Sequence, residues 1–148
     1  MRRAAISALA VFALATASAS ATPAGWQTFT DKRGTCQASV PTDWKPGEYN
    51  IGMQAEHGKG NVIISTSQGG DVAMAKQIAS STFTIVKVIE DTKSRFWAQF
   101  SGRGPTAPAN NYYVALQQPG LVCAMQLSWD SGLSDDDAKA IVASLRKR

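Results

Sequence analysis

The sequence has little of what enzymes and metal sites are usually built from. Its 148 residues include one histidine and two cysteines, which are too few ligands for most zinc sites. Fifteen Lys and Arg against eleven Asp and Glu give a net charge of only +4, so the charge does not indicate a nucleic-acid partner. With 44% apolar residues, 12 Gly and 6 Pro, the composition excludes a disordered or collagen-like chain and favours one globular domain.

The first 21 residues are expected to form a secretory signal peptide. Arg2 and Arg3 precede an apolar stretch rich in alanine, and small residues follow it, as in segments that signal peptidase removes. Two Ala-x-Ala sites compete, one cut before Ser20 and the other before Thr22, and we favour the second. The stretch is shorter than the roughly 20 apolar residues of a membrane span. We therefore expect residues 22–148 to be a single periplasmic or secreted domain with no integral membrane segment.

The two cysteines, Cys36 and Cys123, are expected to form a disulfide, because an even number of cysteines in an exported chain favours pairing. Strand alternation places each thiol on the apolar side of its segment, with Ala38 and Val40 in one and with Leu121, Met125 and Leu127 in the other. The bridge would close a loop of roughly 88 residues and stabilise the fold by about 4 to 5 kcal/mol. A reactive thiol needs exposed electropositive surroundings, which these neighbours do not provide.

The pattern of apolar residues predicts seven strands, at 26–30, 35–40, 61–66, 84–90, 95–101, 112–118 and 121–129. One helix is expected from the N-cap Asp71 to about Ser81, and a second helix after Ser134. The helical spacing predicts two buried stripes: Val72, Ala75, Ile78 and Ala79 in the first helix, and Ala138, Ile141, Val142 and Leu145 in the second. Most connections have hairpin length, so the expected fold class is α+β, with a mostly antiparallel sheet packed by two main helices.

One segment is similar to a known family. The run from Cys36 to Lys45, CQASVPTDWK, a strand that leads into Val-Pro-x-x-Trp, resembles the opening of the PsbP/DcrB-like superfamily. The order of the later elements agrees over roughly residues 26–148. This resemblance implies an antiparallel sheet covered by helices, in an exported or membrane-associated protein without enzymatic activity. The cysteine pair is not part of the general family pattern, which leaves the subfamily and the partner open, and no family binding residue carries over.

The candidate catalytic and metal-binding residues are weak. His57 lies among glycines in Glu56 to Gly60, where a loop histidine is the simpler interpretation, and no Gly-x-Ser-x-Gly motif accompanies it. The acids at Asp135, Asp136 and Asp137 are better explained by the start of a helix than by a calcium loop. We therefore predict no catalytic residue, no metal and no cofactor.

The aromatic residues on the predicted strands give the one candidate binding surface. Alternation groups Trp97 with Arg95 and Gln99, and it groups Tyr113 with Ala115 and Gln117. If both groups share one side of the sheet, Arg95, Trp97 and Tyr113, with Arg103 in the adjoining loop, form a contact patch of the kind that binds a protein or a glycan. The alternative is that a helix covers this side and buries the aromatic rings.

Three hypotheses for function follow. The first is an interaction module without catalysis that binds a protein or an envelope component through this patch and the loop at 102–111. The second is an inhibitor or immunity protein that blocks a hydrolase or toxin with a protruding loop at 56–61. The third is a small hydrolase built from a serine and His57, which the composition makes the least favoured.

Overall fold

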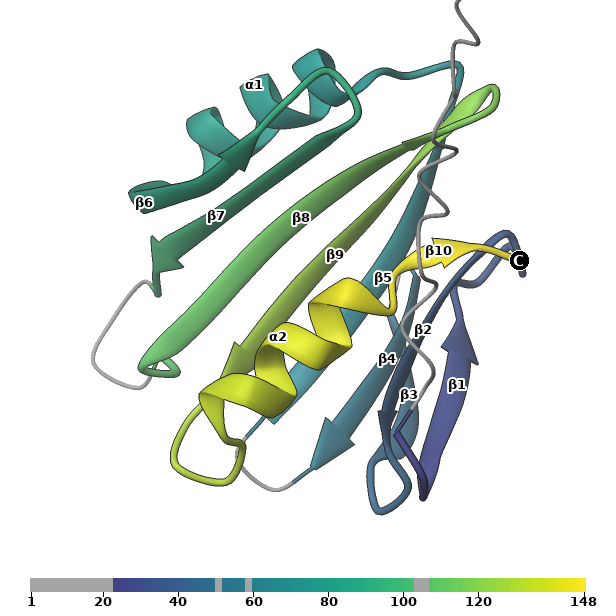
Figure 1. The fold of residues 1–148 in the computed structure, drawn as a ribbon, viewed down its shortest axis with the longest axis vertical. Helices are drawn as coiled ribbons and strands as arrows, with labels where there is room; N and C mark the ends of the chain where they lie inside the picture. Colours follow the sequence, from purple (N-terminus) through teal and green to yellow (C-terminus); the bar gives the residue numbers. More distant parts are fainter. Residues whose placement is uncertain (1–22, 50–51, 58–59, 103–106) are drawn as a thin grey trace, which may run out of the picture.

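The computed structural model describes residues 23–49, 52–57, 60–102 and 107–148. Its main element is a seven-stranded antiparallel sheet in the order β3-β4-β5-β9-β8-β7-β6, drawn in Figure 1. These strands are β3 (Lys45–Tyr49), β4 (Gly52–His57), β5 (Gly60–Gln68), β6 (Thr84–Asp91), β7 (Arg95–Ser101), β8 (Asn110–Gln118) and β9 (Leu121–Trp129). A second, three-stranded sheet consists of β1 (Trp26–Thr30), β2 (Cys36–Pro41) and β10 (Arg146–Lys147) in the order β1-β2-β10.

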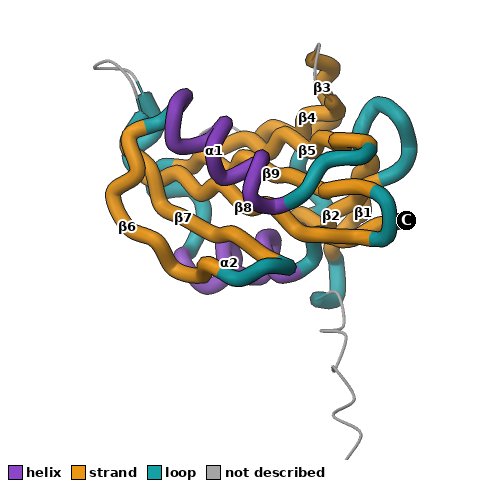
Figure 2. The backbone as a smooth tube through the Cα atoms, turned by 90° about the horizontal axis from the view of Figure 1, so that it is seen from above, coloured by secondary structure: helices purple, strands orange, loops and turns teal. Residues whose placement is uncertain are grey.

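Two helices lie on opposite faces of the large sheet, as Figure 2 shows. Helix α1 (Val72–Thr82) covers one face, which we call the α1 face, and α2 (Asp135–Ala143) covers the other, which we call the α2 face. The three-stranded sheet also packs on the α2 face, where β2 contributes to the same core as α2 and β9. The predicted α+β class, with a mostly antiparallel sheet and two helices, is therefore confirmed.

The predicted disulfide is present. Cys36 on β2 and Cys123 on β9 are fully buried, with Cα atoms 5.6 Å apart. The bond joins the small sheet to a central strand of the large sheet. It thus fixes the opening hairpin against the α2 face.

Both helix starts are also as predicted. The Asp71 carboxylate accepts a hydrogen bond from the backbone N–H of Met74 at 2.8 Å, and the Ser134 hydroxyl accepts one from the N–H of Asp137 at 3.1 Å. The predicted stripe of α2 is buried, but that of α1 is only partly so. Val72, Ala75 and Ala79 are buried, whereas Ile78 is 56% exposed. The prediction for Ile78 was wrong because α1 lies against only part of its face of the sheet.

Three strands were not predicted from the pattern. β3 contains Pro46 and Gly47, residue types that are rare inside strands, and Pro46 is tolerated because β3 is an edge strand. β4 ends at His57, which was expected in a loop. After α2, Arg146 and Lys147 form the short strand β10, which pairs with β2. The helix ends before them because the Ser144 hydroxyl accepts a hydrogen bond from the backbone N–H of Ser39 at 2.7 Å.

Candidate binding surfaces

The residues predicted to form one patch lie on opposite faces of the sheet. In the register of β7 and β8, Trp97 stands opposite Val114, while Tyr113 stands opposite Ala98. Residues directly opposite each other in a sheet share a face, so Trp97 belongs to the α2 face and Tyr113 to the α1 face. Alternation grouped the residues of each strand correctly. The shared patch was wrong because alternation within a strand does not set the register between strands.

Tyr113 lies beneath α1 rather than on a surface. Its side chain is 7% exposed, and its hydroxyl donates a long hydrogen bond of 3.5 Å to the carbonyl oxygen of Ala75. The ring packs at a tilt against Phe83 and Phe96. Burial raises the pKa of the Tyr113 hydroxyl above its ordinary value. Tyr113 is therefore a core residue of the α1 face.

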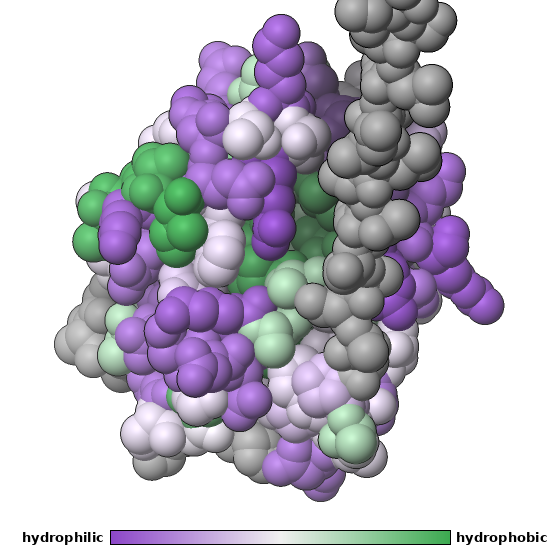
Figure 3. Space-filling model, viewed as in Figure 1, coloured by the Kyte–Doolittle hydropathy of each residue, from purple (hydrophilic) through white to green (hydrophobic). Residues whose placement is uncertain are grey.

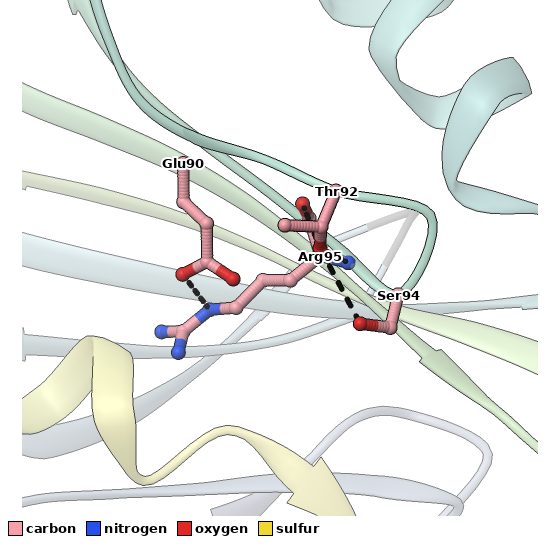
Figure 4. Close-up of polar contacts among 4 residues, drawn as sticks. All are labelled: Glu90, Thr92, Ser94 and Arg95. Atoms are coloured by element: carbon pink, nitrogen blue, oxygen red, sulfur yellow. Dashed lines mark hydrogen bonds and ion pairs between the residues drawn. The ribbon is translucent and has the colours of Figure 1, made fainter.

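Arg95 and Trp97 form a stacked pair on the other face. The Arg95 guanidinium lies 5.4 Å from the centre of the Trp97 ring, a cation–π arrangement, and the indole packs edge-on against Tyr112 at 5.3 Å. Arg95 Nε is 3.6 Å from Glu90 on the neighbouring strand, as Figure 4 shows. Among the described residues, neither Trp97 Nε1 nor Arg95 Nε has a hydrogen-bond partner, although both atoms are buried.

The turn between β6 and β7 holds Arg95 in place. The backbone N–H of Arg95 donates to the Thr92 hydroxyl at 3.0 Å, and the backbone N–H of Thr92 donates to the Arg95 carbonyl at 2.8 Å. Thr92 and Ser94 hydroxyls lie 3.3 Å apart at the tip, as drawn in Figure 4. These contacts fix the backbone at the start of β7, from which the Arg95 side chain extends toward Glu90 and Trp97.

β6 carries an exposed aliphatic patch beside this pair. It consists of Val86, Val88 and Ile89, which are 61%, 47% and 40% exposed, and we call it the β6 patch. Val88 stands opposite Ala98 and so faces the α1 side, whereas Val86 and Ile89 are next to Lys87 and Glu90, which stand opposite Gln99 and Trp97 on the α2 side. Figure 3 shows apolar surface over β6 on the face that α2 covers elsewhere. The register with β7 shifts between Ile85 and Lys87 and again between Val88 and Glu90. Val86 and Ile89 are thus the extra residues of two β-bulges.

Sequence reasoning missed a groove on the α1 face, which we call the α1 groove. It has a volume of about 470 Å³, within the usual range for small-molecule sites. Helix α1 forms one wall, β5 and β9 form the floor, and the turn between β1 and β2 closes one end. Its lining includes Asp31, Lys32, Arg33, Ile63, Ser65, Thr66, Ser67, Asp71, Met74, Ala75, Ile78, Thr82, Phe83, Tyr113, Val122, Ala124, Met125 and Gln126.

One sequence signal could have indicated this groove. Met74 and Ile78 stand four residues apart on α1 and form a second apolar row beside the buried one. They are 52% and 56% exposed. A helix with two apolar rows and one sheet beneath it leaves the second row available for another contact.

The remaining predicted site residues lie partly beyond the described residues. Arg103 is outside them, and so are residues 58 and 59 of the loop proposed for an inhibitor, so both assignments stay predictions. His57 ends β4, where its backbone pairs with Gly60. Within the described ranges, no group of three or more His, Cys, Asp or Glu residues could hold a metal ion. The same part of the chain contains no helix with the length and apolarity that crossing a membrane requires.

Comparison with known proteins relates this chain to others by fold. No protein-family model matches the sequence, and no curated protein matches it. The structure is similar to the solution structure of cyanobacterial PsbP (CyanoP) from Synechocystis sp. PCC 6803, with a TM-score of 0.56 and 10% identity over 87% of this chain and 96% of that one. It is also similar to a crystal structure from Bacteroides thetaiotaomicron VPI-5482, with a TM-score of 0.51 and 12% identity over 84% of this chain and 49% of that one. The protein therefore has a PsbP-like α+β fold.

Proposed function

We propose that the protein is an exported, non-enzymatic module that binds a partner protein, in the periplasm or outside the cell. Three features support export and the type of protein: the signal-peptide pattern of residues 1–21, the buried Cys36–Cys123 disulfide and the PsbP-like fold. Disulfides persist in oxidising compartments. Membership in the PsbP/DcrB-like superfamily is part of the proposal and rests on the CQASVPTDWK segment together with the fold.

The β6 patch beside Arg95 and Trp97 is the observation that carries the binding function. Tryptophan and arginine are enriched among the energetically dominant residues of protein interfaces, and the exposed aliphatic side chains of the β6 patch extend the apolar surface beside them. Such a cluster on a soluble domain indicates an interaction site. The predicted partner surface is apolar at its centre, so that it covers Val86 and Ile89 and packs against the indole of Trp97.

Contact is expected through side chains rather than by addition of a strand. β6 is an edge strand, and a regular edge would accept a partner strand by backbone hydrogen bonds. Its two bulges interrupt that edge, and bulges are a common protection against edge-to-edge pairing. Lys87, a charged residue between the two exposed valines, also disfavours the addition of a partner strand. The partner is therefore expected to contact the aliphatic and aromatic side chains and not the backbone of β6.

Site-directed photo-crosslinking tests this surface. A photoreactive amino acid at Val86 of the mature protein, mixed with native envelope extract, should give one discrete adduct, and Trp97→Ala in the same background should remove it. Position 139 on α2 is the matched control, because the side chain of Lys139 is 50% exposed but lies away from β6. Equal adducts at both positions, or an adduct that survives Trp97→Ala, would contradict the proposed surface.

Intact-mass measurement tests export separately. Natively purified protein should begin at Thr22 or Ser20 and contain no titratable thiol, since Cys36 and Cys123 are paired. An uncut amino terminus or two free sulfhydryls would contradict export while leaving the crosslinking result valid.

A further inference from the structure

The α1 groove is an apolar trough that the proposed protein contact does not use. Its wall carries the exposed side chains of Met74 and Ile78, and its floor includes Ile63, Val122 and Ala124. Phe83 and Tyr113 contribute to the lining at the base of the helix. Because α1 has 11 residues, the helix that forms this wall is about 16 Å long.

The positively charged residues that line the groove lie at one end of it. The turn between β1 and β2 brings Lys32 and Arg33 into the lining, close to the start of α1 at Asp71. Figure 2 shows this turn on the same side of the molecule as the amino-terminal end of α1. The partial positive charge of a helix amino terminus adds to that of the two cations.

The two carboxylates in the lining are engaged with the protein itself. Asp31 is 4% exposed, and its carboxylate accepts hydrogen bonds from the backbone N–H groups of Thr35 and Cys36 at 2.7 and 3.0 Å. It also accepts one from the Thr66 hydroxyl at 2.5 Å. The Asp71 carboxylate accepts from the N–H of Met74. Neither carboxylate is directed at a ligand in the trough.

The cationic turn is also held in position before any ligand binds. Asp31 connects the turn to β5 through Thr66, and the disulfide anchors Cys36 only three residues after Arg33. Gly34 has a φ of +68°, a conformation that suits glycine and shapes the turn. Preorganisation of this kind reduces the cost of ordering the site on binding.

We propose that the α1 groove binds a single-chain amphiphile with an anionic head, of the chemical class of a fatty-acid carboxylate. The carboxylate would lie at the turn near Arg33, and the alkyl chain would lie along Met74 and Ile78 over Ala124. Ser65 and Gln126 add polar side chains to the lining, which a polar head or water can contact. This inference is independent of the β6 patch, which lies on another strand at the far edge of the sheet.

Calorimetric titration with soluble carboxylates tests the proposal. The oxidised mature protein should bind dodecanoate below its micelle concentration, and decanoate, with two methylenes fewer, should bind about fifteenfold more weakly, because each buried methylene contributes about a factor of four. A trimethylammonium head on the same dodecyl chain should weaken binding at least tenfold. Equal affinity for the two heads, or no dependence on chain length, would overturn the assignment.

Variants locate the site. Ile78→Asp and Arg33→Glu should each weaken dodecanoate binding at least tenfold, while the matched changes Val88→Asp and Lys93→Glu outside the groove should not. The aspartate at position 78 replaces an exposed side chain, so thermal unfolding should show a folded protein. Binding unchanged in Ile78→Asp would overturn the proposal. Trp97→Ala should leave dodecanoate binding intact, which separates this result from that of the crosslinking experiment.

Vesicles distinguish a free ligand from a membrane surface. Flotation with phosphatidylglycerol vesicles, without any uptake of monomeric dodecanoate, would overturn the proposal and assign the groove to contact with anionic lipid in a bilayer. Uptake of dodecanoate with no vesicle association supports a carrier-type site for single molecules.

Discussion

The two faces of the large sheet differ in how many buried residues pack against them. Among the described residues, the α2 face has seventeen buried core residues drawn from β2, α2 and the sheet, and a disulfide crosses it. The α1 face has nine, beneath one helix. Since buried apolar area sets most of the stability, the α2 face holds the fold together. The thinner α1 face has room for the groove.

The exposed apolar side chains follow the same division. In the described part of the chain five large ones are well exposed, and none of them lies on α2. Two line the groove on α1 and three form the β6 patch: Met74, Ile78, Val86, Val88 and Ile89. Each candidate surface therefore lies where the second layer of the fold ends. Stability should therefore depend mainly on the α2 face, and binding on the exposed residues of α1 and β6.

Removing the disulfide should have the largest effect. Cys36→Ala with Cys123→Ala should lower the free energy of unfolding by about 4 kcal/mol, because a bridge across 87 residues of sequence restricts the unfolded chain strongly. Guanidinium unfolding of the oxidised and double-variant proteins measures the difference. A loss below about 1 kcal/mol would show that packing alone holds the small sheet on the α2 face.

A matched pair of isoleucines, one on each helix, compares the two faces directly. Ile141 on α2 is fully buried and Ile78 on α1 is 56% exposed. Ile141→Ala should cost about 3 kcal/mol through lost burial and a cavity, whereas Ile78→Ala should cost less than about 0.5 kcal/mol. The same unfolding assay gives both values. Similar losses would mean that the α1 groove is part of the core and not an open site.

Removing either helix cap should have a smaller effect on stability, of similar size for the two helices. Asp71→Ala and Ser134→Ala each remove a side-chain acceptor for a backbone N–H, and each should cost about 1 kcal/mol. Hydrogen exchange should show faster exchange near the start of the affected helix only. If Asp71→Ala also increased exchange throughout α2, the two faces would not be independent.

Much of the fold could be predicted from local patterns. The strand at 95–101 alternates between buried and less buried residues, and those at 112–118 and 121–129 are rich in apolar residues. The helix starts at Asp71 and Ser134 carry their own capping side chains. The disulfide could be predicted because each thiol lies on the apolar face of its strand. β10 has only two residues and forms because β2 lies beside it. No local sequence pattern predicts a strand of only two residues.

The candidate surfaces could not be predicted in the same way. Whether Trp97 and Tyr113 share a face depends on the register of β7 and β8, which links residues far apart in the chain. Whether Ile78 is buried depends on how far α1 lies across the sheet. Both are properties of packing between elements. The sequence supports the choice of Trp97 and Arg95 as a pair, but it cannot assign Tyr113 to the opposite side.

Two neighbouring tyrosines offer the smallest and most specific test of the difference between the faces. Tyr112 lies on the α2 face, where its hydroxyl donates a hydrogen bond to the Asp135 carboxylate at 3.2 Å. Burial and this carboxylate raise the pKa of Tyr112 above its ordinary value. Burial alone raises the pKa of Tyr113 on the α1 face. Because folding favours the neutral phenols, their stabilisation is complete below pH 10 and is lost as the pH rises through the folded-state pKa values.

Asp135→Asn should lower the pKa of Tyr112 and leave the pKa of Tyr113 unchanged. NMR titration of the assigned rings measures both pKa values, and Tyr112→Phe and Tyr113→Phe serve as assignment controls. An equal change at both rings would show that the charge on α2 acts through the sheet, and the two faces would then be electrostatically coupled.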